Sequence, residues 1–580
     1  MRSILRIFTI FTPKQQKYCV FIIFCMVIGA MFEAVGIGAI LPLISIMGDP
    51  AFLDKHPVIR GYASLLQIHS HNAFIIASAG LLILFYMIKN FYMAWQTRLQ
   101  IRFSIQNQIF YAGQLLAGYL NKPYLYHLDQ NSATLLRNVN SGAIVTFSAI
   151  LVPAFTLITE IITAVTIWAM LVLVDPFTAI IVAGVLGLMM YGIIKTFRKE
   201  ITQQGKVQNA YSAVYLKWLN QGLGAIKETK VLRKESFFLQ EFNKAYDEFG
   251  EANSGFMFLN QLPRMLIESI VVSGLLLLIV TKLALGTAPM DIVPLLGVLA
   301  LAAFRLMPCA NRIVNLSNGI RFQMPLFNEL YDEFMAIKKR QINKEQILLP
   351  ATEHKMPFEH EIRIEHLGFQ YPQGKQDVLQ DVSFSVPKGS FVGVIGQSGA
   401  GKTTFVDILL GLLEPTSGRI CADGTNIYDD VRAWQANLSY VPQSIYLIDG
   451  TIRENIALGI AEKDIDDTKI KKVLKMAELY DFVEALPDKI HTTVGERGVK
   501  LSGGQRQRIG IARALYYEPE VLILDEATSA LDNETEKSIT DTIIKLKGKI
   551  TIIAIAHRVS TLVDCDFKIK FEDGRAEEIK

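Results

Sequence analysis

The segment Gly396-Gln-Ser-Gly-Ala-Gly-Lys-Thr403 decides the fold of the last third of this 580-residue chain. It follows a β-rich run, Phe391–Ile395, and opens a helical pattern, Thr403–Leu412, which is the context that makes a Gly-x-x-x-x-Gly-Lys-Thr match specific. Glycines let the backbone N–H groups of such a loop surround a phosphate, and the helix N-terminus adds partial positive charge. We therefore expect Lys402 to reach the terminal phosphates of a nucleotide and the Thr403 hydroxyl to bind Mg²⁺.

A second segment, Val521-Leu-Ile-Leu-Asp-Glu526, has the pattern of a buried strand that ends in two carboxylates. Asp525 is expected to hold the magnesium ion, directly or through water. Glu526 follows at the position from which a carboxylate polarises the attacking water in phosphoryl transfer. A solvated loop would also carry two acids, but four aliphatic residues precede them and Ala-Thr-Ser-Ala-Leu-Asp follows them.

The third segment, Leu501-Ser-Gly-Gly-Gln505, predicts another anion site, because the Ser502 hydroxyl and the glycine amides lie at a helix start. One small domain cannot clamp a nucleotide from both sides. We therefore expect this segment to complete the nucleotide site of a second copy of the chain.

The first 314 residues differ sharply from the rest, because they contain long apolar runs. The chain as a whole is 51% hydrophobic with a mean hydropathy of +0.30, which is too apolar for a soluble protein of this length. Six runs meet the length of about 20 residues that crosses a bilayer. They are Tyr18–Met47, Ala73–Trp95, Ala143–Val174, Phe177–Thr196, Leu262–Leu285 and Ile292–Val314. The first run has no cleavage site after a short apolar core, so we expect a retained helix.

The distribution of lysine and arginine predicts the orientation of these spans. Basic residues precede the first span and crowd the segments between spans two and three and between spans four and five, while the opposite side has few. Both termini are therefore expected in the cytoplasm. The five cysteines show no paired or metal-like spacing, which suits a reducing compartment. The net charge of +3 is explained by the inside loops, so we expect no nucleic-acid partner.

The two inside loops are polar but helically patterned, so the membrane helices are expected to continue into the cytoplasm. Their tips, near Asn121–Gln130 and Gly222–Lys234, would contact the ATPase domain. The outside segment Val58–Ile68 fits a short helix on the membrane surface or a packed loop. These patterns predict a transmembrane domain over residues 1–337, a linker over 338–361, and an α/β domain over 362–580, where β-rich runs alternate with helical ones.

Together, these motifs resemble an ABC transporter of the exporter type, with membrane and ATPase domains fused, over essentially the full length. The resemblance implies an all-α six-helix transmembrane domain with long cytoplasmic helix extensions, followed by an α/β P-loop ABC ATPase domain. It also implies a homodimer that uses ATP and Mg²⁺. In this family Tyr371 matches the aromatic that stacks on adenine, and Gln443 matches the glutamine that senses the metal and contacts the membrane helices.

The same resemblance matches Asp532 to a cross-subunit aspartate and His557 to a histidine that senses the γ-phosphate. Gly495-Glu-Arg-Gly498 matches the segment with which exporters touch the partner's cytoplasmic loops. The expected catalytic residues are Glu526, His557, Lys402 and Gln443, and the expected metal ligands are Thr403, Gln443 and Asp525. The expected ATP-binding set is Tyr371, Gly396, Gln397, Ser398, Gly399, Ala400, Gly401, Lys402, Thr403, Thr404, Gln443, Ser502, Gly503, Gly504, Gln505, Asp532 and His557.

Ionisable residues inside the expected spans raise the question of what is moved, because such residues are costly and usually face a cavity. Lys89, Arg264 and Arg305 lie at a similar level, roughly 20–25 Å from the outer helix ends at about 1.5 Å per residue. A ring of cations at one depth would attract a diphosphate. Equally, cations near inner helix ends snorkel to the interface, and Arg264 has Glu268 four residues on as a partner.

The run Ala303–Ile313 and the Leu262-Pro-Arg264 step resemble bacterial flippases for lipid-linked oligosaccharides, of the PglK kind. That resemblance implies a bacterial inner-membrane protein whose partners are membrane lipid and an anionic, undecaprenyl-diphosphate-linked oligosaccharide. Arg264 and Arg305 would contact the diphosphate, and Lys89 stands where an arginine is expected, without the bidentate fork. The alternatives are a multidrug, lipid or peptide exporter of the same fold and, in another class, an ATP-gated channel or regulator.

Overall fold

The computed structural model describes residues 2–48, 71–174, 176–284, 289–343, 354–372, 374, 376–526, 533–555 and 562–579. The chain forms two compact units. The helical unit comprises Met1–Lys122 and Gln130–Leu348, and the C-terminal unit comprises Leu349–Lys580 together with the short segment Pro123–Asp129. The expected outside helix Val58–Ile68 lies outside the described residues.

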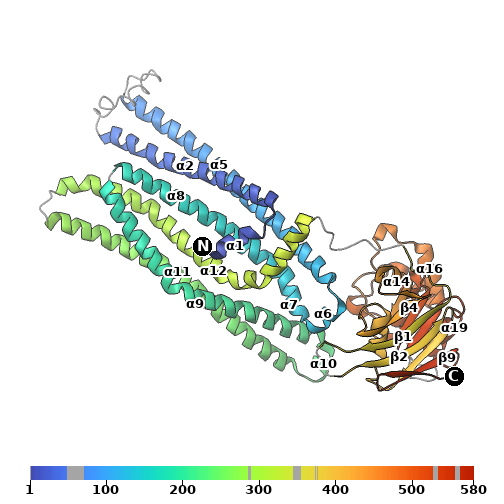
Figure 1. The fold of residues 1–580 in the computed structure, drawn as a ribbon. Helices are drawn as coiled ribbons and strands as arrows, with labels where there is room; N and C mark the ends of the chain where they lie inside the picture. Colours follow the sequence, from blue (N-terminus) through green and yellow to red (C-terminus); the bar gives the residue numbers. More distant parts are fainter. Residues whose placement is uncertain are drawn as a thin grey trace. The chain divides into compact units, whose positions relative to one another are not determined.

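Within the described residues, six long helices form the helical unit (Figure 1). They are α2 (Pro13–Gly48), α5 (His71–Leu120), α8 (Val152–Val174), α9 (Pro176–Gly224), α11 (Glu235–Ala284) and α12 (Pro289–Asn343). A helix of 50 residues, such as α5, is about 75 Å long at 1.5 Å per residue, far more than the bilayer core of about 30 Å. The expected long extensions beyond the apolar spans are therefore confirmed.

Four helical stretches of the described residues are long and apolar enough to cross a membrane. They are Pro13–Gly36, Asn72–Leu120, Ser132–Ala169 and Glu235–Ala284. The short helices of this unit are α1 (Arg2–Thr9), α7 (Ser132–Arg137) and α10 (Ile226–Val231).

The helix α8 continues a run that begins at α7 and passes through two π-helical segments, η1 (Asn138–Gly142) and η2 (Val145–Leu151). Polar contacts fix these segments against α5. The Ser104 hydroxyl donates to the Phe147 carbonyl at 2.6 Å, and Ser148 pairs with Gln108 at 2.6 Å. Aromatic side chains that include Phe147 and Tyr111 form the buried core around them.

The linker begins later than expected, because α12 continues to Asn343. Residues 338–343, which the sequence placed in the linker, are helical instead. Ile337 is buried in the core of the helical unit, and the Lys338 ammonium donates to the Thr9 carbonyl at 2.5 Å. These contacts keep the last turns of α12 helical despite their high charge.

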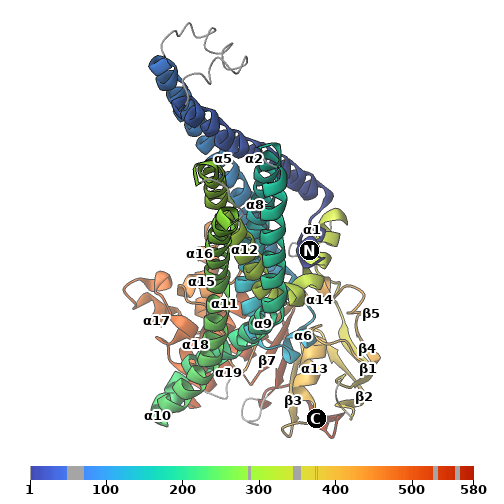
Figure 2. The same ribbon diagram turned by 90° about the vertical axis from the view of Figure 1, so that its left-hand side faces the viewer.

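The C-terminal unit contains two sheets (Figure 2). The four-stranded antiparallel sheet has the order β2-β1-β4-β5 and the six-stranded sheet the order β10-β9-β3-β8-β7-β6. In the second sheet β9, β3, β8, β7 and β6 pair in parallel, as the alternating pattern predicted. The strands are β1 (Glu361–Phe369), β2 (Leu379–Pro387), β3 (Phe391–Gly396), β4 (Ser417–Ala422), β5 (Thr425–Asn426), β6 (Leu438–Val441), β7 (Val521–Asp525), β8 (Thr551–Ile555), β9 (Phe567–Glu572) and β10 (Arg575–Ile579).

The helices of this unit pack into two separate hydrophobic clusters. The buried residues of α13 belong to one cluster, and those of α16 and α18 belong to the other. The helices are α6 (Tyr124–Asp129), α13 (Lys402–Leu409), α14 (Val431–Gln435), α15 (Ile452–Ile456), α16 (Asp467–Met476), α17 (Tyr480–Glu484), α18 (Gly503–Tyr516) and α19 (Asn533–Ile544), with 3₁₀ turns η3 (Glu462–Asp464), η4 (Lys489–His491) and η5 (Glu496–Gly498).

Candidate functional site

The glycine-rich loop joins β3 to α13, as the sequence predicted. Gly401 precedes the helix with φ of +98°, and a Cβ there would lie 2.7 Å from a methyl group of Leu379. At Gly396 a Cβ would lie 2.4 Å from the Phe571 carbonyl oxygen. Only glycine fits both positions, so the loop curls tightly at the start of α13 with its amides available to a phosphate.

Lys402 is buried beneath this loop. Its ammonium donates to the carbonyl oxygens of Gly396 and Gln397, both at 2.8 Å. Burial lowers the pKa of Lys402, while the carboxylates of Glu526 and Asp525 act in the opposite direction. The ammonium is therefore held at the loop and faces the two acids that the sequence assigned to the same site.

Asp525 and Glu526 lie at the carboxyl end of β7, between its parallel neighbours β6 and β8. The Tyr440 hydroxyl donates to Asp525 Oδ2 at 3.2 Å, and the Gln443 amide donates to Glu526 Oε2 at 2.6 Å. Glu526 has φ of +48°, a left-handed conformation that turns the chain away from the strand. The structure thus brings together Lys402, Gln443 and both acids.

The donor set at this edge fits a magnesium ion. Mg²⁺ is usually bound by one or two carboxylates, with substrate phosphates and water completing its shell. Asp525 supplies a carboxylate, and the Thr403 side chain is exposed at the first turn of α13. The described residues contain no cluster of three His, Cys, Asp or Glu side chains that could hold a metal ion.

Two residues of this site escaped the sequence analysis, Tyr440 and Asp407. Asp407 lies on α13, and burial, followed by the nearby charge of Asp525, raises its pKa to about 6 from an ordinary value of 3.8. A lone acid within the apolar run Phe405–Leu409 was the signal that could have indicated it. Tyr440 carries no such signal, since an aromatic residue in a strand is ordinary.

Tyr371, the expected adenine-stacking residue, lies beside α13. Its ring packs edge-on against Phe369 with a centroid distance of 4.9 Å, and its hydroxyl lies 3.3 Å from Thr404 Oγ1. The ring is half-buried, so part of its surface remains open. Stacking on adenine stays a prediction.

Ser502 caps the first turn of α18. Its hydroxyl accepts a hydrogen bond from the backbone N–H of Gln505 at 3.2 Å. In return, the side-chain carbonyl oxygen of Gln505 accepts a hydrogen bond from the backbone N–H of Ser502 at 2.8 Å. Ser502 is exposed. Because α18 packs into a different hydrophobic cluster from α13, this helix start and the glycine-rich loop belong to separate parts of the unit.

Two expected nucleotide residues, Asp532 and His557, lie outside the described residues. The segment Gly495–Gly498 forms the 3₁₀ turn η5, followed by Val499 with 76% of its surface exposed. Of the expected loop tips, α6 clusters with the C-terminal unit. Its Leu125 packs against the same hydrophobic cluster as α13.

The three expected substrate cations are not alike. Lys89 is buried and forms an ion pair with Glu33 at 2.7 Å in the single chain, and its contact with a substrate stays a prediction. Arg264 is exposed. Arg305 lies in α12, and the structure describes its backbone but not its side chain. Arg312, a fourth intramembrane cation, pairs with Glu160 at 2.7 Å.

Residues 379–529 match the family model described as "ABC transporter". The C-terminal domain is an ABC transporter ATPase domain. The whole chain aligns with a bacterial Atm1-family ABC exporter solved with ATP bound, with a TM-score of 0.71 and 23% identity over 94% of this chain and 95% of that one. The fold is therefore that of an ABC exporter.

Curated relatives match over part of the chain. An "ATP-dependent lipid A-core flippase" of Bordetella avium is 43% identical over 223 residues, which is 38% of each chain. The "Putative multidrug export ATP-binding/permease protein YgaD" of Bacillus subtilis is 42% identical over 219 residues, 38% of this chain and 37% of that protein. The matched stretch thus spans less than two fifths of these relatives' length.

Proposed function

We propose that this protein is an ATP-driven transporter that works as a homodimer in the bacterial inner membrane, with both termini in the cytoplasm. The observation that carries the proposal is the convergence of Lys402, Asp525, Glu526 and Gln443 on one edge of the parallel sheet. An ATPase of this design needs a phosphate loop, a metal-binding carboxylate and a group that orients water, and each is present.

The chain's own residues divide the work of hydrolysis. The amides of the glycine-rich loop and Lys402 hold the phosphates. Glu526 accepts a hydrogen bond from the attacking water and takes its proton, and the Gln443 amide holds that carboxylate in place. Mg²⁺, held by Thr403, Asp525 and Gln443, would neutralise charge on the phosphates.

The second half of each nucleotide site comes from the partner copy in this proposal. The exposed Ser502 and the start of α18 would close on the γ-phosphate bound by the other chain, with Gly503, Gly504 and Gln505. Asp532 and His557 are assigned to the same seam. ATP binding would then draw the two domains together, and phosphate release would part them.

The first test is the variant Glu526→Gln, which keeps the hydrogen bond to Gln443 but cannot take a proton. We expect it to bind ATP normally while hydrolysis falls by about 10²–10⁴-fold. The matched control is Glu518→Gln, an exposed carboxylate just before β7 that should leave turnover unchanged. Normal hydrolysis by the Glu526 variant would remove the base from the proposal.

For the substrate, we propose a lipid-linked, undecaprenyl-diphosphate oligosaccharide that is moved from the inner to the outer leaflet. The support is the resemblance to oligosaccharide-lipid flippases, together with a relative named for flipping lipid A-core. The test is a liposome assay with fluorescent lipid-linked sugars. ATP-dependent flipping that Arg305→Ala abolishes without loss of ATPase would support a diphosphate contact, whereas unchanged flipping would leave Arg305 as an interface anchor.

A second candidate is export of drugs, lipids or peptides, favoured by the relative named for multidrug export. The same liposomes separate the two functions: ATP-dependent uptake of a fluorescent drug without flipping of lipid-linked sugars would favour the exporter. A gated channel needs binding more than turnover, so the base at Glu526 speaks against that class.

A further inference from the structure

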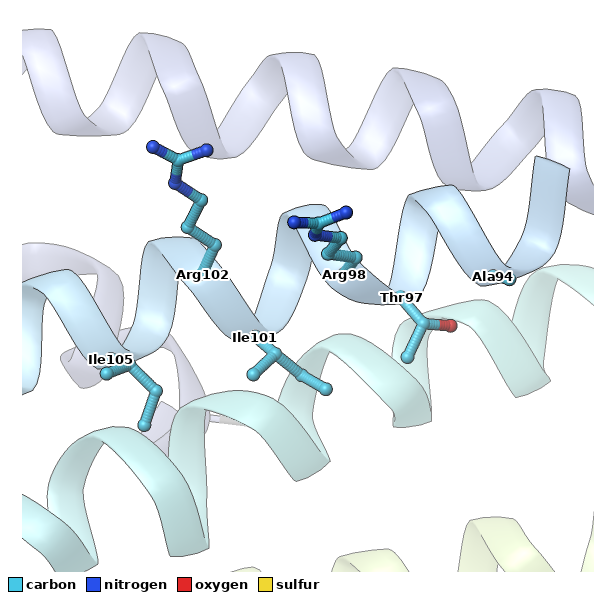
Figure 3. A pocket seen from close by; sticks show the side chains of 6 residues that line it. All are labelled: Ala94, Thr97, Arg98, Ile101, Arg102 and Ile105. Atoms are coloured by element: carbon cyan, nitrogen blue, oxygen red, sulfur yellow. The ribbon is translucent and has the colours of Figure 1, made fainter. Parts of the chain in front are cut away.

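Two arginines of α5, Arg98 and Arg102, line an open cavity of about 690 Å³ on the surface of this helix. All the residues that line it are exposed in the single chain. The remaining lining residues are Ala94, Thr97, Ile101 and Ile105. Figure 3 shows the arginines extending toward one side of α5, whereas Thr97, Ile101 and Ile105 extend toward the other. The lining therefore combines a cationic side with a largely apolar one.

The described part of the chain gives the two arginines no counter-ion. The 50-residue helix α5 contains no aspartate or glutamate. Its neighbours α2 and α8 each contain one glutamate, and both are paired: Glu33 with Lys89, and Glu160 with Arg312. The helix α12 also contacts α5, and its Glu333 accepts a hydrogen bond from Tyr119, 17 residues beyond Arg102. Among the described residues no ion pair involves Arg98 or Arg102, so the cavity has two positive charges available for an anion.

The level of these arginines on α5 suits a lipid head group. The apolar run of this helix ends at Trp95, so Arg98 and Arg102 lie roughly 5 and 10 Å beyond it at a rise of about 1.5 Å per residue. Head groups occupy about this depth outside the hydrocarbon core. In the apolar run before them, Met87 and Phe91 are exposed, which offers a hydrocarbon chain an apolar path along the same helix.

We propose that this cavity receives the phosphorylated head group of the transported lipid as it arrives from the inner leaflet, with Arg98 and Arg102 binding its phosphates. The inference rests on the proposed function and names the site of first contact. Side chains four residues apart on a helix are neighbours, and each guanidinium presents a fork that matches phosphate oxygens. The pair therefore selects a diphosphate over an uncharged head group.

The test uses the full-length protein in nanodiscs of phosphatidylcholine, titrated with undecaprenyl diphosphate and, in parallel, with undecaprenol. The quenching or enhancement of Trp95 fluorescence reports binding, because Trp95 lies one helical turn from Arg98; a Trp95→Phe variant assigns the signal. In the double variant Arg98→Gln/Arg102→Gln, we expect affinity for the diphosphate to fall at least about tenfold, because the charge-assisted hydrogen bonds of the two guanidinium groups are lost.

The matched control is Lys195→Gln/Lys199→Gln. These exposed cations also stand four residues apart, at the inner end of the expected fourth span, and they do not line the cavity of Arg98 and Arg102. Diphosphate affinity should stay unchanged in this control. An equal loss in both double variants would mean general attraction between basic residues and anionic lipid, and would overturn the inference.

Three other results would also overturn it: equal affinity of wild type and arginine variant, equal affinity for undecaprenol, or loss of the dimer in the arginine variant. The last would assign the arginines to an interface with a second copy. If the wild type flips a labelled diphosphate-linked sugar and the arginine variant binds undecaprenyl diphosphate with the affinity of wild type, only this inference fails. If the wild type neither binds nor flips the diphosphate, the proposed substrate fails with it.

Discussion

Replacing Lys89 by methionine should loosen the packing of α2 against α5. The Lys89 ammonium lies 2.7 Å from a Glu33 carboxylate oxygen, and the two side chains are 7% and 16% exposed. The ammonium also lies 4.8 Å from the ring centroid of Tyr86. Because the substitution takes a charged partner away from a largely buried carboxylate, Lys89→Met should cost about 3–5 kcal/mol.

The double variant Lys89→Met/Glu33→Gln is the matched control. Replacing both members of a buried pair by uncharged side chains of similar size is often neutral, so it should recover most of the loss. At about 2–4 °C per kcal/mol, the single variant should melt at least about 6 °C below wild type. Thermal unfolding in detergent can be followed with a thiol-reactive dye, since Cys19, Cys25 and Cys309 are buried.

A single variant that melts like wild type but loses stimulation by a lipid-linked diphosphate would refute this reasoning. Lys89 would then be a substrate contact in the working dimer, as its position in the apolar span suggested. A double variant that melts as low as the single one would also contradict the argument, because the cost would come from lost packing of the lysine stem rather than from the lost ion pair.

Three further substitutions test the nucleotide site and the helix packing. Tyr440→Phe removes the 3.2 Å hydrogen bond to Asp525. Loss of a residue that orients a metal ligand typically lowers metal affinity about 10–100-fold, so the Mg²⁺ concentration for half-maximal ATPase activity should rise. An unchanged Mg²⁺ titration would exclude this orienting role. Asp407→Asn tests pH dependence: burial and Asp525 raise the folded pKa to about 6 from 3.8, so wild type loses stability as pH rises through 6. The variant should therefore melt above wild type at pH 7–8 and level with it below pH 4, measured without nucleotide or metal, whereas a pH-independent difference would contradict the shift. Gly205→Ala places a Cβ 2.1 Å from the Phe322 carbonyl oxygen, so α9 and α12 must separate at a cost of about 1–3 kcal/mol; a melting temperature equal to wild type would show that the helices adjust freely.

The nucleotide site was largely predictable because its chemistry is local. The glycine-rich loop needs a strand before it and a helix after it, and all three are contiguous in the sequence. The bounds differ by one residue at the strand end and at the helix start, and α13 stops at Leu409, three residues before the expected Leu412. Gly411, with φ of +68°, ends the helix, as glycine in a left-handed conformation commonly does.

The pairing of intramembrane charges was not predictable from the sequence. Lys89 and Glu33 are separated by 56 residues, and whether they meet depends on the rotation of α2 and α5 about their own axes. Hydrophobic periodicity gives little information on that rotation here, since these helices are apolar nearly all round. Depth alone grouped Lys89 with Arg264, whereas the structure buries one and exposes the other.

Asp407 links α6 electrostatically to Asp525 at the carboxyl end of β7. The Tyr124 pKa is raised by burial and then by the charges of Asp407 and Tyr371. The Tyr440 pKa is raised by burial and by Asp525, with smaller contributions from Asp407 and Tyr124. These groups share one electrostatic field, because interactions at a partly buried site are poorly screened. If Asp525 holds a divalent cation, as proposed, the ion would also change the charge environment of Tyr124 on α6.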